Sequence, residues 1–88
     1  MELRVLRPAQ RAVARGEFAS ALAAVAEHRR RFPSGRLAEE REALRVKALL
    51  GLGRSVEAEQ AGAAFHKRFP RSALDGRIDE MLGTQEQK

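Results

Sequence analysis

The sequence predicts an all-α fold in which about five helices form tandem antiparallel hairpins. Three observations lead to this prediction. Ala, Leu, Arg, Glu and Gln, which all favour helix, dominate the 88 residues, whereas β-branched residues are scarce. Gly and Pro stand between the helix-compatible stretches. Most informative, the sequence resembles itself when it is shifted by 37 residues.

The self-similarity depends on four pairs of anchor residues. They are Gly16 and Gly53, Ala21 and Ala58, Phe32 and Phe69, and Pro33 and Pro70. The abundance of Ala explains part of the match but not the Gly, Phe and Pro pairs. The shift therefore predicts two copies of one structural unit, covering about residues 5–35 and 36–72.

Each anchor pair has a physical role in a helix–turn–helix unit. A glycine tolerates the positive φ that a chain reversal needs, so we expect turns at Gly16 and Gly53. A small alanine lets a neighbouring helix approach closely, and each phenylalanine ends an apolar stripe. Proline disfavours helix in the residue before it, so the second helix of each unit should stop at Pro33 and at Pro70.

The expected helices follow from these boundaries. They cover about residues 7–15, 18–31, 36–52, 56–68 and 73–82 of one domain, 1–83, followed by a polar tail at 84–88. Pro8 fits the opening turn of the first helix. Ser34, Ser55 and Ser72 are candidate N-caps of later helices, and Asp75 stands at capping-box spacing from Ser72. The last helix should cap the stack.

The third expected helix has an unusually wide apolar surface. Its apolar residues are Leu37, Leu44, Ala48 and Leu52 along one face and Val46, Leu49 and Leu50 beside it. A helix that packs on one side needs an apolar stripe of only about 100°. The wider surface favours a central position with neighbours on both sides.

The pattern resembles the tetratricopeptide repeat, a helix–turn–helix unit of about 34 residues with a small residue in its second helix and a closing proline. The residues at the family spacing are Gly16, Ala21 and Pro33, and again Gly53, Ala58 and Pro70. The Phe-Pro pair with a following Ser is similar to the variant common in bacterial envelope proteins, such as outer-membrane assembly lipoproteins and periplasmic coordinators of cell division. The longer period and the first helix of each unit, with Pro8 and Glu42 at family apolar positions, depart from the pattern.

This resemblance implies a non-catalytic protein–protein interaction or scaffold domain whose shallow groove receives a peptide or a partner's helix. About three units usually bury a continuous core. Two units therefore need a capping helix, self-association or a place at one end of a longer array. The expected partner is a protein or peptide, and the formal charge of +5 favours an acidic one.

The sequence offers no constellation for an enzyme, a cofactor or a metal ion. Cysteine is absent, which excludes a thiolate ligand or nucleophile. His28 and His66 lack metal-ligand spacing and should be structural. A group of carboxylates with cations at helical spacing is interpreted as ordinary surface pairs. These residues are Glu39, Glu40 and Glu42, with Arg41, Arg45 and Lys47.

Two basic clusters suggest an alternative function. The shift places them at equivalent helix ends, as one basic edge made of Arg29, Arg30, Arg31, Lys67 and Arg68. Such an edge could bind an acidic partner or a phosphate backbone, as in a nucleic-acid-binding helical module. The ordinary explanation is that cations suit helix C-termini. Nucleic acid is the less favoured partner, because base stacking needs exposed aromatic rings and every Phe is expected to be buried.

The compartment is not specified. No run approaches the 18 apolar residues of a membrane span, and no signal-peptide core follows Met1. The sequence is compatible with a cytoplasmic or periplasmic domain, and with a piece of a membrane-anchored protein.

Overall fold

The computed structural model describes residues 1–86, and side chains through residue 83. Its helices are α1 (Glu2–Ala14), α2 (Phe18–Arg31), α3 (Ala38–Gly51), α4 (Ser55–Arg68) and α5 (Asp75–Glu86). The described residues contain no strand. The predicted all-α class with about five helices is therefore confirmed.

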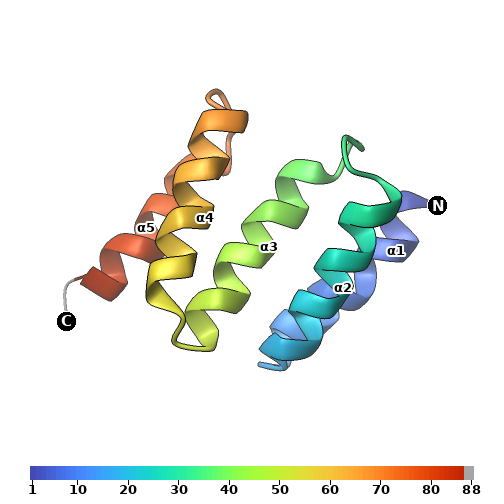
Figure 1. Cartoon of the computed structure of the whole chain (residues 1–88), viewed down its shortest axis with the longest axis horizontal. Coiled ribbons are helices and arrows are strands. Elements are labelled where there is room, and N and C mark those ends of the chain that lie inside the picture. Colours follow the sequence, from blue (N-terminus) through green and yellow to red (C-terminus); the bar gives the residue numbers. More distant parts are fainter. Residues whose placement is uncertain (87–88) are drawn as a thin grey trace.

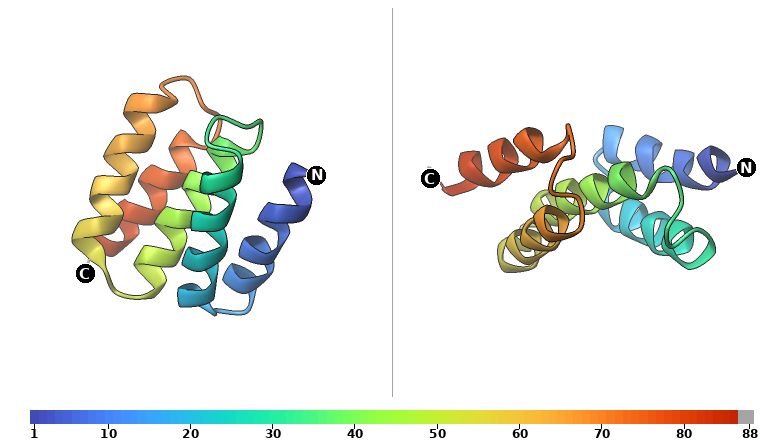
Figure 2. Two further views of the ribbon diagram at one scale, coloured as in Figure 1. Left: turned by 45° about the vertical axis from the view of Figure 1, so that its right-hand side comes forward. Right: turned by 90° about the horizontal axis from the view of Figure 1, so that it is seen from above.

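Successive helices run antiparallel and form two layers (Figures 1 and 2). Seen from above in Figure 2, α1 and α5 lie on one side of α3, and α2 and α4 lie on the other. α3 contacts each of the other four helices, whereas α1 does not contact α5 and α2 does not contact α4. The predicted central position of the third helix is confirmed. None of the described helices combines the length and the apolar character that crossing a membrane requires.

Two glycines make the reversals from α1 to α2 and from α3 to α4. Gly16 has a φ of 75° and Gly53 a φ of 74°. The N–H of Gly16 donates to the carbonyl of Val13 at 3.1 Å, and the N–H of Glu17 donates to that of Ala12 at 2.8 Å. The same two bonds recur around Gly53. This is the Schellman arrangement that ends a helix, so the prediction of turns at both glycines is confirmed.

The Phe-Pro pairs end α2 and α4 as expected. Each helix stops immediately before its phenylalanine. Phe32 and Phe69 have φ of −137° and −126° with ψ of 64°, outside the helical region. The pyrrolidine rings of Pro33 and Pro70 explain this, because proline disfavours helix in the residue before it.

Small and aliphatic side chains fill the core. Ala21 and Ala58 have no exposed surface, in agreement with their expected interface positions. The largest cluster joins α3, α4 and α5, and two smaller clusters join α1, α2 and α3. The largest cluster consists of Val46, Leu49, Ala58, Ala61, Phe65 and Ile78. Because α3 contributes to all three clusters or their margins, it connects the two ends of the molecule.

The start of the first helix differs from the prediction. α1 begins at Glu2, and Pro8 lies in its middle rather than in its opening turn. Pro8 is exposed, so the carbonyl that its missing N–H leaves unpaired can face water. Leu6, Ala9 and Val13 are buried at helical spacing, and this burial stabilises helix on both sides of the proline.

The expected serine N-caps of α3 and α4, Ser34 and Ser55, are wrong. The residues that precede α3 and α4 are Leu37 and Arg54, and neither makes a side-chain cap hydrogen bond. Ser55 is the first helical residue of α4. Ser72 accepts a hydrogen bond from the N–H of Leu74 at 3.0 Å, within the turn before α5. No capping box forms there, because the Asp75 carboxylate is directed to His66 instead.

The C-terminal boundary also differs. α5 begins at Asp75 rather than at residue 73 and continues to Glu86, so residues 84–86, expected in a polar tail, are helical. The remaining residues of that expected tail, 87–88, lie outside the described part of the chain. Gln85 and Glu86 favour helix, which agrees with the continuation of α5 beyond Gly83 and Thr84.

The two reversal glycines should resist replacement by alanine. Gly16→Ala and Gly53→Ala have free space for a Cβ but must keep a positive φ. Each should therefore lower the free energy of unfolding by about 1 kcal/mol. Gly76→Ala is the matched control: it also has free space but lies within α5 without positive φ, and should stabilise by about 0.5–1 kcal/mol. Urea unfolding would measure all three, and equal shifts at Gly16 and Gly76 would contradict the assignment.

Candidate functional site

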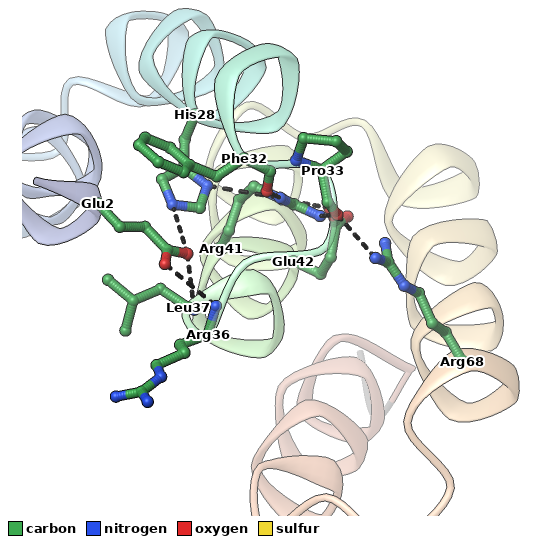
Figure 3. Close-up of polar contacts among 9 residues, drawn as sticks. All are labelled: Glu2, His28, Phe32, Pro33, Arg36, Leu37, Arg41, Glu42 and Arg68. Carbon is green, nitrogen blue, oxygen red and sulfur yellow. Dashed lines mark hydrogen bonds and ion pairs between the residues drawn. The ribbon is translucent and has the colours of Figure 1, made fainter.

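A buried arginine lies where α2 turns into α3. Arg41 of α3 has no exposed surface. Its Nη1 donates to the carbonyl of Phe32 at 2.9 Å and its Nη2 to that of Pro33 at 3.3 Å. Its Nε donates to the Glu42 carboxylate at 2.7 Å. Figure 3 shows the guanidinium directed at the turn, so Arg41 supplies donors to carbonyls of the residues that follow α2.

His28 of α2 completes this buried group. Its ring is fully buried, with Nδ1 3.4 Å from Arg41 Nη1 and Nε2 3.2 Å from Glu2 Oε1. Since the guanidinium only donates, Nδ1 must accept and the proton belongs on Nε2. Burial, together with the charge of Arg41, lowers the pKa of His28. The ring is therefore neutral and directs its N–H side toward the carboxylate without a well-aligned hydrogen bond.

Glu2 reaches the same turn from the start of α1. Its carboxylate accepts the N–H groups of Leu37 at 2.8 Å and Arg36 at 3.1 Å, just before α3 (Figure 3). These bonds lower the pKa of Glu2. Gly35 makes room for them, because a Cβ there would collide with the carboxylate. The two amides are thus held in a turn, which explains why α3 begins at Ala38 and not at the expected residue 36.

The shift of 37 residues turns this polar group into an apolar one. His28 corresponds to Phe65 and Arg41 to Ile78, both buried in the largest core cluster. Gly35 corresponds to Ser72, whose own hydroxyl binds the following turn. The group of Glu2, His28, Arg41 and Glu42, here called the buried polar cluster, is therefore particular to the α2–α3 turn.

The buried polar cluster corrects the interpretation of the carboxylates near the start of α3. Arg41 is fully buried and Glu42 is 9% exposed, so their pair is not a surface pair. Glu39 and Glu40 do lie at the surface or near it. The burial of Arg41 could have been inferred from Ile78 at the shifted position. The contacts of Glu2 with His28 and with the turn before α3 had no signal in the sequence.

The basic edge is assembled at one end of the molecule, where α2 and α4 both end (Figure 1). Most of its cations are engaged internally. Arg30 pairs with Glu27 at 2.6 Å, and Arg29 lies 3.7 Å from Glu42. Arg31 and Arg68 cover the rings of Phe32 and Phe69, with centroid distances of 5.9 and 5.0 Å. Lys67 is exposed and has no ion pair with a described residue.

Arg68 also connects the two hairpins. Its Nη2 donates to the Pro33 carbonyl at 2.8 Å, an oxygen that Arg41 contacts as well (Figure 3). The two Phe-Pro turns are thereby joined through one carbonyl. The anchor phenylalanines are half-buried and only Phe65 is fully buried, so the expectation that every Phe is buried is wrong.

One hollow lies between α1 and α5, with α3 as its floor. Its volume is about 850 Å³. Its lining is Gln10 of α1, Arg36, Glu39, Glu40, Ala43, Leu44 and Lys47 in and before α3, and Ser72, Ala73, Leu74, Arg77, Glu80 and Met81 in and before α5. We call this hollow the α3 groove. Sequence reasoning expected a groove but could not identify these residues, because they come from three helices far apart in the chain.

The α3 groove has an aliphatic lining from α3 and the α5 side, and its rim charges balance. Leu44, Leu74 and Met81 supply apolar surface. Three cations face three carboxylates: Arg36, Lys47 and Arg77 against Glu39, Glu40 and Glu80. No histidine lines the groove. Such a surface can bind a chain segment by shape and apolar contact, with the rim charges fixing its direction.

His66 bridges α4 to α5. Its Nδ1 lies 2.9 Å from Asp75 Oδ2 and its Nε2 lies 2.9 Å from Asp79 Oδ1. The hydrogen bond to Asp79, with the charges of both aspartates, raises the pKa of His66. Two acceptors require two N–H donors, so the imidazolium is the form that fits. Within the described residues, no group of three His, Asp or Glu side chains is arranged to hold a metal ion.

Comparison with protein-family models, with curated proteins and with solved structures finds no match to this chain.

The pKa values of the two histidines should be shifted in opposite directions from the ordinary value near 6.5. The raised pKa of His66 gives stability that is fully present below the unfolded pKa and is lost as pH rises through the folded one. NMR titration of the ring protons should find the pKa of His66 above 6.5 and that of His28 below it. His66→Gln should lower the melting temperature at about pH 5.5 more than at about pH 8.5. An equal loss at both values would contradict the His66 bridge.

The buried polar cluster should be replaceable only as a unit. Arg41→Ile alone removes the donors to two carbonyls and leaves the Glu42 charge poorly paired, at a cost of about 3 kcal/mol in unfolding free energy. Adding His28→Phe reproduces the Phe65 and Ile78 pair of α4 and α5 and should recover at least about half of that loss, since packed apolar groups can replace buried ions. Chemical denaturation measures both variants. A stable Arg41→Ile variant would show that the cluster is not needed.

Proposed function

We propose that this chain is a non-catalytic protein–protein interaction domain, a tetratricopeptide-like helical scaffold whose α3 groove receives a peptide or a partner's helix. The observation that carries the proposal is the α3 groove itself. It combines an aliphatic lining with charged rims, and α1 and α5 stand as its two walls on the same side of α3. Hollows of this kind bind extended or helical segments through a few apolar anchors.

The resemblance of the two hairpins supports the repeat part of the proposal. The reversals at Gly16 and Gly53 have the same φ and the same hydrogen bonds. The ends at Phe32 and Phe69 have the same non-helical conformation. Equivalent local geometry at a constant spacing of 37 residues is what a stacked helical repeat requires. In this arrangement α5 occupies the place of the first helix of a further unit and caps the stack.

The charge balance of the α3 groove refines the expected partner. The net charge of +5 favours an acidic partner for the whole chain, but the rim of this groove is neutral. We therefore propose a segment with two or three aliphatic side chains and charges of both signs as its ligand. The excess of positive charge lies elsewhere on the molecule.

The non-catalytic part of the proposal follows from how the chemically capable side chains are used. His28 is enclosed with Arg41, and His66 is held between two aspartates. The nucleic-acid alternative has less support. Two cations of the basic edge, Arg31 and Arg68, lie over the half-buried rings of Phe32 and Phe69. Base stacking would have to displace these contacts.

A peptide selected for binding tests the groove. A displayed peptide library would be selected on the immobilised chain, and the best peptide titrated against two tryptophan variants. Ala73→Trp fills the α3 groove from an exposed position, and Ala63→Trp is an equally exposed substitution on α4 outside it. We expect Ala73→Trp to weaken binding by about tenfold or more, equivalent to about 1.4 kcal/mol, and Ala63→Trp to leave it unchanged.

Equal affinity for both tryptophan variants would place the binding surface elsewhere and contradict the proposal. Failure to select any peptide would do the same. Circular dichroism of each variant checks that the helices are intact, since more than half of the residues should remain helical.

A further inference from the structure

A second hollow is lined by residues of α2, of α3 and of the start of α4. α2 and α4 lie on the side of α3 opposite to α1 and α5 (Figure 2). The volume of the hollow is about 410 Å³. Its lining is Leu22, Val25, Ala26, Arg29 and Arg30 of α2, Arg45 and Leu49 of α3, and Arg54 and Glu57 in and before α4. We call it the arginine hollow. It shares no lining residue with the α3 groove, so the two surfaces can be altered separately.

The arginine hollow carries much of the chain's excess positive charge. Four arginines line it against a single glutamate. Two of the arginines are already paired: Arg30 with Glu27 at 2.6 Å, and Arg54 with Glu57 through bonds of 2.6 and 2.8 Å. Arg29 is more than half exposed and has only a 3.7 Å approach to Glu42. Part of its guanidinium is therefore free to bind another acceptor.

Arg45 is the most informative residue of the hollow. Its side chain is half-buried, yet it makes no hydrogen bond or ion pair with any described residue. Its charge is felt at Glu57, whose pKa it helps to lower after the larger effect of Arg54. A guanidinium presents several donors in one plane, which match the two oxygens of a carboxylate. Arg45 is thus a donor without an acceptor, beside an apolar floor.

We propose that the arginine hollow binds an acidic segment of a partner protein, with its carboxylates on Arg45 and Arg29 and an aliphatic side chain against Leu22 and Ala26. Charge complementarity selects the acidic character, and the apolar floor selects the aliphatic anchor. α2 lines the hollow from Leu22 to Arg30, so it offers a wall of about two and a half helical turns, and the start of α4 closes one end of the hollow at Arg54 and Glu57. This surface is distinct from the α3 groove and would let one domain hold two partners.

An acidic protein segment fits the hollow better than nucleic acid does. No aromatic ring lines the hollow, so bases have no stacking platform. A phosphate backbone needs a row of free cations, but two of the four arginines are neutralised by glutamates. The aliphatic floor would also remain uncovered under a phosphate chain. Nucleic acid is therefore an outcome that the experiment must be able to detect.

The test uses the ¹⁵N-labelled full chain and three probes. The first probe is a peptide of about 14 residues, built from Leu, Ala and Glu with leucines on one helical face and glutamates beside them. The second replaces every Glu by Gln, and the third is a mixed-sequence DNA duplex.

Three variants accompany the native chain: Arg45→Glu, Ala26→Gln, which fills the hollow from an exposed position, and Lys47→Glu as the matched control. Lys47 lies on the same helix as Arg45 but lines the α3 groove. Lys47→Glu therefore changes the net charge by the same amount as Arg45→Glu without altering the arginine hollow.

We expect the acidic peptide to shift amide signals in the segments of α2 and α3 that line the arginine hollow. Its affinity should fall by about tenfold or more with Arg45→Glu, with Ala26→Gln and with the Gln peptide, and stay unchanged with Lys47→Glu. Four results would overturn the proposal. They are no saturable binding, equal affinity of the Gln peptide, an equal loss with Lys47→Glu, and tighter binding of DNA than of the peptide. Shifts confined to Leu44 and Leu74 would also overturn it, while leaving the proposed function of the α3 groove intact.

Discussion

A single buried cation determines how the two helical hairpins meet. The Arg41 guanidinium lies in the interior at the α2–α3 turn and donates to the carbonyls of Phe32 and Pro33 and to Glu42. A buried charge without partners costs several kcal/mol, so conformations of the turn that leave Arg41 unpaired are strongly disfavoured. Arg68 binds the same Pro33 carbonyl from the end of α4. The cation thus favours a single arrangement of the two hairpins, whereas a purely apolar contact would allow several arrangements.

The consequences extend from this turn to both candidate binding surfaces. Glu2 attaches α1 to the turn through two backbone amides, and α3 starts where those bonds end. α1 is thereby held beside α3 on the side where α5 also lies, and the space between them is the α3 groove. On its other side, α3 contributes Arg45 and Leu49 to the arginine hollow. A central helix in contact with every other helix can thus present two different surfaces, which is a useful property for a scaffold.

The sequence predicted what is determined locally. Gly16 and Gly53 were identifiable because a chain reversal needs positive φ, and the helix ends because Pro33 and Pro70 restrict the residue before them. The shift of 37 residues then predicted which helices would be equivalent. These features depend on a few neighbouring residues, so a single sequence contains the information for them.

The remaining features depend on residues that are far apart in the chain. The bonds from Arg36 and Leu37 to Glu2 span more than thirty positions. No residue near position 37 indicates that a side chain of α1 accepts these two N–H groups. Arg41 and Lys47 look alike as cations on one helix, although the first is buried and the second exposed. The residues of the basic edge could be listed from the sequence, but their contacts with Glu27, Glu42 and the phenylalanine rings depend on the fold. The lining of both hollows likewise requires the packing of three helices.

Hydrogen exchange of the Arg41 side chain tests the central claim most directly. The guanidinium Nε–H is enclosed and bonded to Glu42, so a ¹⁵N-edited NMR spectrum of the full chain should contain one separate, slowly exchanging Nε–H signal with a nuclear Overhauser contact to the His28 ring. If Arg41 exchanged as fast as the exposed arginines and overlapped with them, the buried cation would not be the junction of the two hairpins.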